Sequence, residues 1–184
     1  MIGVSSPLGS LGSDSILYEA NSGYQALGAT VETQFATYNL PAAKLIGDFF
    51  TKRRMICEEF MAGINFAAAT ARLTLNEYWN GTLVQQITVN PQLTGVQSFG
   101  AGQNKAIDIN TQMRMESGTT TACAIRGHIA YSSSFNGATL WGDKNEHSYG
   151  QIAVDVRSGV NVVWKYQWNA ASNLFYFDHL KVTW

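Results

Sequence analysis

Hydrophobic and polar residues alternate along most of this chain, with the two-residue period of strands that bury one face. The last regular stretch is residues 160–168, where large apolar side chains occupy every second position: Val160, Val162, Trp164, Tyr166 and Trp168. Residues 105–115, 119–134 and 149–156 repeat the pattern, and residues 174–184 carry large side chains on both faces. The chain therefore favours strands over helices.

The clearest turn lies within residues 71–89. Asn80 and Gly81 separate two alternating runs, and both accept the positive φ values of the type I′ turn that joins two strands. The apolar positions are Leu73, Leu75 and Trp79 on the first arm and Leu83, Ile87 and Val89 on the second. The pattern predicts a β-hairpin with one buried and one solvated face.

Turn residues separate about eight to ten such runs, and no repeat of fixed period links them. This arrangement predicts an all-β protein, and we expect an antiparallel jelly-roll sandwich of about 8–10 strands. Residues 15–184 are long enough for one domain with a sizeable core. Residues 1–14 are rich in Gly and Ser without periodicity, which predicts a flexible, extended N-terminal arm.

The region after Pro41 fits the strand pattern least well. Pro41 ends a predicted strand at residues 30–40, because proline cannot donate to a sheet ladder. Gly47 and Asp48 then predict a turn into a long strand, residues 49–64. The alternation there is imperfect, so a helix over residues 42–54 remains an alternative.

The chain is poor in charge. Charged residues make up 14% of it, against roughly 25% in an average protein, and the net charge is −1. Charge depletion is typical of the centre of a subunit interface, and a neutral β-domain of extracellular type has it too. Lys52, Arg53 and Arg54 form the one basic run, and on a strand they would point to opposite faces. We therefore predict no nucleic-acid partner. We also predict no secretory signal and no membrane insertion.

No pattern of catalytic or metal-binding residues emerges. His128, His147 and His179 fall on separate predicted elements without metal-ligand spacing. Glu58 and Glu59 are adjacent on a predicted strand and point in opposite directions, so they cannot flank one substrate bond. The sequence therefore predicts no catalytic residue, no cofactor and no metal site, and we expect a protein that is not an enzyme.

The two cysteines, Cys57 and Cys123, lie far apart in sequence without zinc-type spacing. Buried free thiols are the expectation, and a single disulfide is the alternative.

Four residues are candidates for contact with a ligand or partner. Trp141, His147 and Tyr149 surround the most polar loop of the chain, and Trp79 stands beside the Asn80-Gly81 turn. Exposed aromatic rings stack on sugar faces, which is the functional interpretation. Packing in the core or in an interface is the alternative.

Three short motifs in the first half of the chain carry a resemblance. They are ETQFATYNLPA at residues 32–42, Gly47-Asp48, and ATARLTL at residues 69–75. Together they resemble a recurrent jelly-roll domain of tailed bacteriophage virion proteins, which is similar to the trimeric TNF and C1q fold. The resemblance covers about residues 30–80, and only the strand pattern extends it further. Residues 49–55 depart from it, because they are bulkier and more basic than the family's usual stretch.

The resemblance implies a virion component on the particle surface, with other capsid or tail proteins as partners. It favours a homotrimeric, non-enzymatic structural protein, either a capsid decoration protein or a capsid-attached spike or head-fibre component. The alternative is the receptor-binding or carbohydrate-binding module of a tail-fibre tip, with a host-surface glycan as ligand. Coiled-coil heptads and fibrous repeats are missing from the sequence, which favours a small protein attached to a particle over a long fibre.

Overall fold

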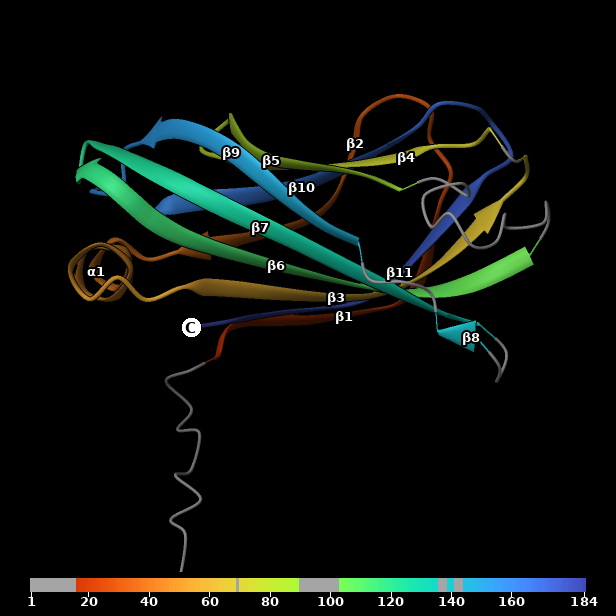
Figure 1. Cartoon of the computed structure of the whole chain (residues 1–184), viewed down its shortest axis with the longest axis horizontal. Coiled ribbons are helices and arrows are strands. Elements are labelled where there is room, and N and C mark those ends of the chain that lie inside the picture. Colours follow the sequence, from red (N-terminus) through yellow and green to blue (C-terminus); the bar gives the residue numbers. More distant parts are fainter. Residues whose placement is uncertain (1–15, 69, 90–102, 136–138, 141–143) are drawn as a thin grey trace, which may run out of the picture.

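Two antiparallel β-sheets lie face to face, and the inward-pointing residues of their strands fill the space between them (Figure 1). This computed structural model describes residues 16–68, 70–89, 103–135, 139–140 and 144–184. The first sheet contains β1 (Ile16–Leu27), β11 (Leu174–Thr183), β3 (Ile56–Phe66), β6 (Gln103–Thr119), β7 (Ala122–Phe135), β8 (Thr139–Leu140) and β9 (Lys144–Val154). The second contains β2 (Thr33–Leu40), β10 (Val160–Trp168), β4 (Leu73–Trp79) and β5 (Thr82–Val89).

The strand order is that of a jelly roll. The first sheet runs β1-β11-β3-β6-β7 and the second β2-β10-β4-β5, so early strands pair with late ones in both sheets. The chain crosses from one sheet to the other between β1 and β2, between β2 and β3, and between β3 and β4. β7 and its partner β9 widen the first sheet beyond β6. The predicted all-β antiparallel sandwich is confirmed, and the predicted N-terminal arm lies outside the described residues.

Aromatic side chains dominate the core. Trp79, Trp164 and Trp168 of the second sheet are completely buried. Trp164 meets Phe60 edge to face with ring centroids 4.7 Å apart, and Trp168 meets Phe66 in the same way at 5.7 Å. Edge-to-face pairs of this kind stabilise a fold by about 0.5–1.5 kcal/mol beyond the area they bury. The sheets are therefore joined by rings that interlock across the sandwich.

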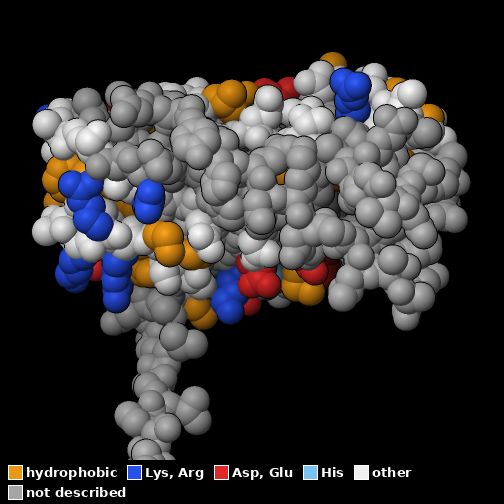
Figure 2. Space-filling model, viewed as in Figure 1, with side chains coloured by type: hydrophobic (Ala, Val, Ile, Leu, Met, Phe, Trp, Pro, Cys, Tyr) orange, Lys and Arg blue, Asp and Glu red, His pale blue; other side chains and the backbone are white. Residues whose placement is uncertain are grey.

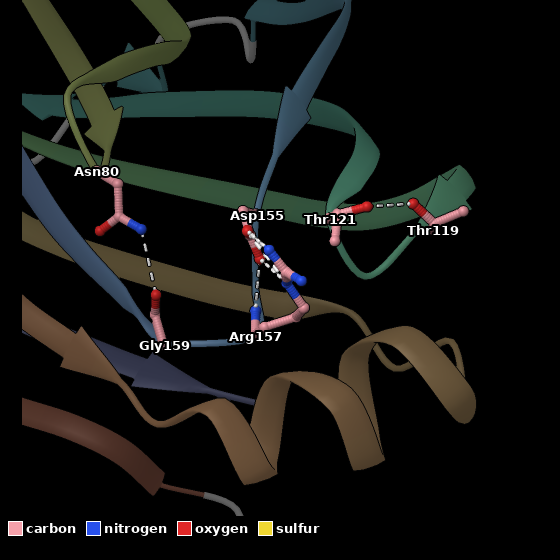
Figure 3. Close-up of polar contacts among 6 residues, drawn as sticks. All are labelled: Asn80, Thr119, Thr121, Asp155, Arg157 and Gly159. Atoms are coloured by element: carbon pink, nitrogen blue, oxygen red, sulfur yellow. Dashed lines mark hydrogen bonds and ion pairs between the residues drawn. The ribbon is translucent and has the colours of Figure 1, made fainter.

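The predicted hairpin at β4 and β5 is confirmed. Asn80 and Gly81 have φ values of 47° and 83°, and the two strands pair directly on either side of them. The Asn80 side chain also accepts a hydrogen bond from the Asn161 N–H at 2.8 Å and donates one to the Gly159 carbonyl at 3.2 Å (Figure 3). This one turn residue therefore fixes the neighbouring turn that leads into β10.

The region after Pro41 is helical, so the prediction of a strand over residues 49–55 is wrong and the helical alternative is right. α1 (Ala42–Lys44) continues directly into the π-helical turn η2 (Leu45–Thr51). The first helical hydrogen bond runs from the Leu45 N–H to the Pro41 carbonyl at 3.0 Å. Leu45 and Phe49, four residues apart, are completely buried, so the burial of one helical face decides the structure here.

Among the described residues, no helix combines the length and the apolar character that crossing a membrane requires.

Candidate docking surface and a buried pair of carboxylates

The helical segment closes one end of the sandwich and carries a cluster of cations. The Phe49 ring lies 5.8 Å from that of Trp79, which anchors the segment on the core. With Leu45 and Phe49 facing inward, Lys44, Lys52 and Arg54 keep exposed side chains. Figure 2 shows blue side chains gathered at the side of the molecule where Figure 1 places α1.

Asp48 lies at the centre of this cluster. Its side chain is only 12% exposed, and the Lys52 ammonium donates a hydrogen bond to its Oδ1 at 2.9 Å. The Arg54 guanidinium lies 3.8 Å away, and the Lys44 ammonium lies 4.0 Å from Oδ2. The hydrogen bond from Lys52, together with the charges of Lys52, Arg54 and Lys44, lowers the pKa of Asp48. One ionised carboxylate thus holds three cations in place.

Arg53 completes the cluster and ties it to the first sheet. Its backbone adopts a left-handed φ of 56°, and its guanidinium donates to the Met115 carbonyl of β6 at 3.3 Å. Lys44, Asp48, Lys52, Arg53 and Arg54 form what we term the cationic end. Four cations against one carboxylate give it a formal charge of +3, whereas the whole chain has −1, which leaves −4 for all other residues.

Apolar side chains accompany these charges. Ile46 within η2 and Met55 directly after Arg54 are 36% and 44% exposed. Methionine and arginine are enriched in protein interfaces relative to the rest of the surface. Arginine and exposed methionine at this end are the residues that a protein–protein contact would use.

Two turns of the sheets lie beside the helical segment (Figure 3). Arg157 binds Asp155 through two nitrogens, with Nη2 2.7 Å from Oδ2 and Nε 3.1 Å from Oδ1. This hydrogen-bonded contact lowers the pKa of Asp155. The Thr119 and Thr121 hydroxyls lie 2.9 Å apart in the turn between β6 and β7. Arg157 is neutralised within its own turn, so it adds little to the charge of the cationic end.

Inside the core, the structure brings together two carboxylates that the sequence did not connect. Glu58 of β3 is 1% exposed and accepts three hydrogen bonds: from the Tyr38 hydroxyl, from the Thr111 hydroxyl at 2.5 Å and from the Trp164 indole at 3.0 Å. Burial raises the pKa of Glu58, and the three donors oppose that shift. The donors come from β2, β6 and β10, so this carboxylate links both sheets.

Glu77 of β4 is the second buried carboxylate. It accepts hydrogen bonds from the Trp79 indole at 2.5 Å and from the Gln85 amide. Burial, followed by the charge of Glu58, raises the pKa of Glu77 well above its ordinary value. The same two carboxylates, together with burial, raise the pKa of Tyr38. Neither carboxylate is accessible, so the pair does not form a substrate site.

The predicted contact residues have different outcomes. Trp79 is completely buried against Phe49 and Glu77, so its prediction as an exposed, sugar-stacking ring is wrong. Trp141 lies outside the described residues. His147 and Tyr149 lie on β9, where only the backbone is described, and they remain predictions.

The remaining sequence predictions concern the thiols, the basic run and metals. Cys57 is a free, half-buried thiol, so the disulfide alternative is wrong for this residue, and the state of Cys123 lies outside the described side chains. The expectation that Lys52, Arg53 and Arg54 are separated by strand alternation is wrong, because they follow a helix. In the part of the chain that the structure describes, no three His, Cys, Asp or Glu residues gather as metal ligands do.

Fold and surface together define this chain as a jelly-roll β-sandwich with one cationic end. No protein-family model matches the chain, and a search of curated proteins gives no match.

Proposed function

We propose that this chain is a non-enzymatic structural protein of a bacteriophage particle. In this proposal it acts through trimerisation and docking, as a capsid decoration protein or a capsid-attached spike or head-fibre component. The single observation that carries the proposal is the strand order β1-β11-β3-β6 facing β2-β10-β4-β5. It is the jelly-roll arrangement implied by the resemblance of residues 30–80 to tailed-phage virion domains.

The surface supports a role in association. Apolar side chains stay exposed on several elements: Ile16, Val31, Ile46, Met55, Met61 and Leu83. Exposed large apolar side chains of this kind are available for burial in a contact between subunits. At roughly 25 cal/mol per Å² of apolar surface, a subunit interface of ordinary size provides substantial stabilisation.

Light scattering coupled to size-exclusion chromatography tests the trimer. The expected mass is about three times the 20.1 kDa of one chain. A folded monomer at every accessible concentration would contradict the proposal. Quantitative mass spectrometry of purified particles tests the location: hundreds of copies indicate decoration, and a handful indicate a vertex or tail position.

A polar cluster on the outer face of the second sheet favours a carbohydrate-binding module as a second candidate function. Glu32 accepts hydrogen bonds from the Tyr78 hydroxyl at 2.6 Å, the Asn76 amide at 2.7 Å and the Lys165 ammonium at 3.0 Å. Gln86 donates to Asn76 at 2.8 Å. The Tyr78 hydrogen bond is the main cause of the lowered pKa of Glu32. A fixed carboxylate and two amides are groups that bind sugar hydroxyls, and the Tyr78 ring beside them is covered on one side by the Lys165 ammonium, 4.5 Å from its centroid.

A glycan array separates the two functions. Binding of a glycan by the wild-type chain, lost on Tyr78→Ala or on Trp141→Ala, would support the second candidate and assign its site. Absence of binding to every glycan would remove it, whereas the structural role would be unaffected.

A further inference from the structure

A patch on the outer face of the first sheet carries charge of the opposite sign to the cationic end, and Arg114 is exposed on the same face of β6 beyond that patch. Cross-strand pairing places Lys181 of β11 between Glu19 of β1 and Glu59 of β3, and it places Asp108 of β6 opposite Met61 of β3. Paired residues share one face of a sheet. These five residues form what we term the acidic face. Three carboxylates against one ammonium give it a formal charge of −2.

Like charges lie close together on this face. Asp108 pairs with Met61, two residues after Glu59 on β3, and burial together with the charge of Glu59 raises the pKa of the Asp108 carboxyl. Met61 is 46% exposed. A cationic surface with apolar side chains of its own would relieve the repulsion and cover Met61.

We propose that the cationic end of one copy of this chain binds the acidic face of a second copy, head to tail. The inference deepens the proposed function and rests on it, because it names the two surfaces that build the oligomer. The two surfaces have opposite formal charges, +3 on the cationic end and −2 on the acidic face. Each also carries exposed apolar side chains: Ile46 and Met55 on the cationic end, and Met61 on the acidic face. A second copy is thus a partner whose chemistry complements the cationic end.

The positions of the two surfaces agree with this arrangement. Figure 1 places α1 at one end of the sandwich, whereas β1 and β3 lie along its lower side. In Figure 2 several blue side chains gather at that end, and red side chains lie on the lower side beside orange ones and one blue side chain. Met55 stands directly before β3, four residues from Glu59, so the two surfaces adjoin but share no residue. A contact between two different surfaces closes into a ring when its rotation permits, and a trimer is such a ring.

Contacts within the chain bring the cations of this end together. Lys52 donates a hydrogen bond to Asp48, Lys44 and Arg54 lie within 4.0 Å of the same carboxylate, and Arg53 donates to the Met115 carbonyl of β6. Exposed Ile46 and Met55 beside the cations favour a protein surface as the partner.

A charge-swap experiment on the full chain tests the proposal. Lys52→Glu/Arg54→Glu removes the cationic end, and Glu59→Lys/Asp108→Lys removes the acidic face. We expect either double variant to raise the dissociation constant of the oligomer at least tenfold in analytical ultracentrifugation. We expect the quadruple variant, in which both signs are reversed, to recover most of the wild-type association. Arg72 is exposed and lies outside both surfaces. Arg72→Glu is therefore the control for charge reversal and should leave the dissociation constant of the oligomer unchanged.

The outcomes are distinct. Oligomers that persist unchanged in both double variants would overturn this inference and leave the proposed trimer standing. A quadruple variant as weak as either double variant would also overturn it. A wild-type chain that is monomeric throughout would instead refute the proposed function itself. Thermal unfolding of each variant shows whether the chain is folded, and the conservative Lys52→Gln/Arg54→Gln gives the same test without introducing new carboxylates beside Asp48.

Discussion

Glu58 on β3 and Glu77 on β4 come from opposite sheets, and both carboxylates are buried in one core, where the charge of Glu58 raises the pKa of Glu77. Glu58 has three hydrogen-bond donors, whereas Glu77 has two. Two ionised carboxylates in one apolar interior are costly. Glu58, which accepts more hydrogen bonds, therefore keeps its charge more readily. Glu77 is the carboxyl group that favours protonation.

Glu77→Gln should stabilise the protein at neutral pH, because burial and the charge of Glu58 raise the pKa of Glu77 and a neutral amide avoids that cost. The amide retains an acceptor for the Trp79 indole without a charge to bury. Urea denaturation at pH 7 measures the difference. Asp178→Asn, at a half-buried position of β11 outside both proposed contact surfaces, is the control and should change the free energy of unfolding by less than about 0.5 kcal/mol.

The pH dependence follows from the same pKa. The folded-state pKa of Glu77 is raised, so its contribution favours the folded state below the unfolded value of 4.5 and is lost as the pH rises through the folded-state pKa. Wild-type stability should therefore fall more steeply than that of Glu77→Gln as the pH rises above 4.5. Parallel curves for the two proteins over this range would contradict the assignment.

Glu58→Ala should destabilise the protein by about 3–5 kcal/mol, since it leaves three buried donors without an acceptor and opens a cavity. Glu58→Gln should cost much less, because the amide oxygen still accepts from Tyr38 and Trp164, while its NH₂ group donates to the Thr111 hydroxyl. The ratio of the two effects in chemical denaturation distinguishes hydrogen bonding from charge. An equal loss in both variants would show that the carboxylate charge itself holds the sheets together.

The sequence revealed the strands because alternation is a local property. The opposite directions of Glu58 and Glu59 follow from it, and the structure confirms that one is buried and the other exposed. The partnership of Glu58 with Glu77 was not predictable, since it depends on which sheets face each other. The alternation also fails at β5, where Val84 is buried and Leu83 is exposed because a register shift follows Glu77. A bulge of this kind has no sequence signal here.

The cationic end was missed for a different reason. Gly47 and Asp48 predict a turn, and the residues after a turn are then expected to form a strand. The spacing of Lys44, Asp48 and Lys52 was the available signal, because charges four residues apart meet on one side of a helix. Helical periodicity over so short a segment is weak beside the strand pattern that surrounds it.

Phe49→Ala should destabilise the protein by about 3–5 kcal/mol, because Phe49 is completely buried against Trp79 and anchors the helical segment. Phe50→Ala, at the adjacent half-buried position, should cost clearly less and is the matched control. Chemical denaturation measures both. Similar losses for the two variants would contradict the helical facing that buries Phe49, and with it the placement of the cationic side chains on the opposite side.

Substitution by alanine at two glycines with different surroundings should change the stability of the protein in opposite directions. Gly159 has a φ of +86°, and a Cβ there would lie 3.0 Å from the Leu40 carbonyl oxygen, so Gly159→Ala should destabilise the protein by about 1–3 kcal/mol. Gly47 lies inside η2 with open space around the position of a Cβ, so Gly47→Ala should stabilise the protein by about 0.5–1 kcal/mol. Thermal unfolding of the two variants checks both signs. A loss of stability in Gly47→Ala would mean that this segment is not helical in solution, because a turn with positive φ at Gly47 is the arrangement in which alanine is disfavoured.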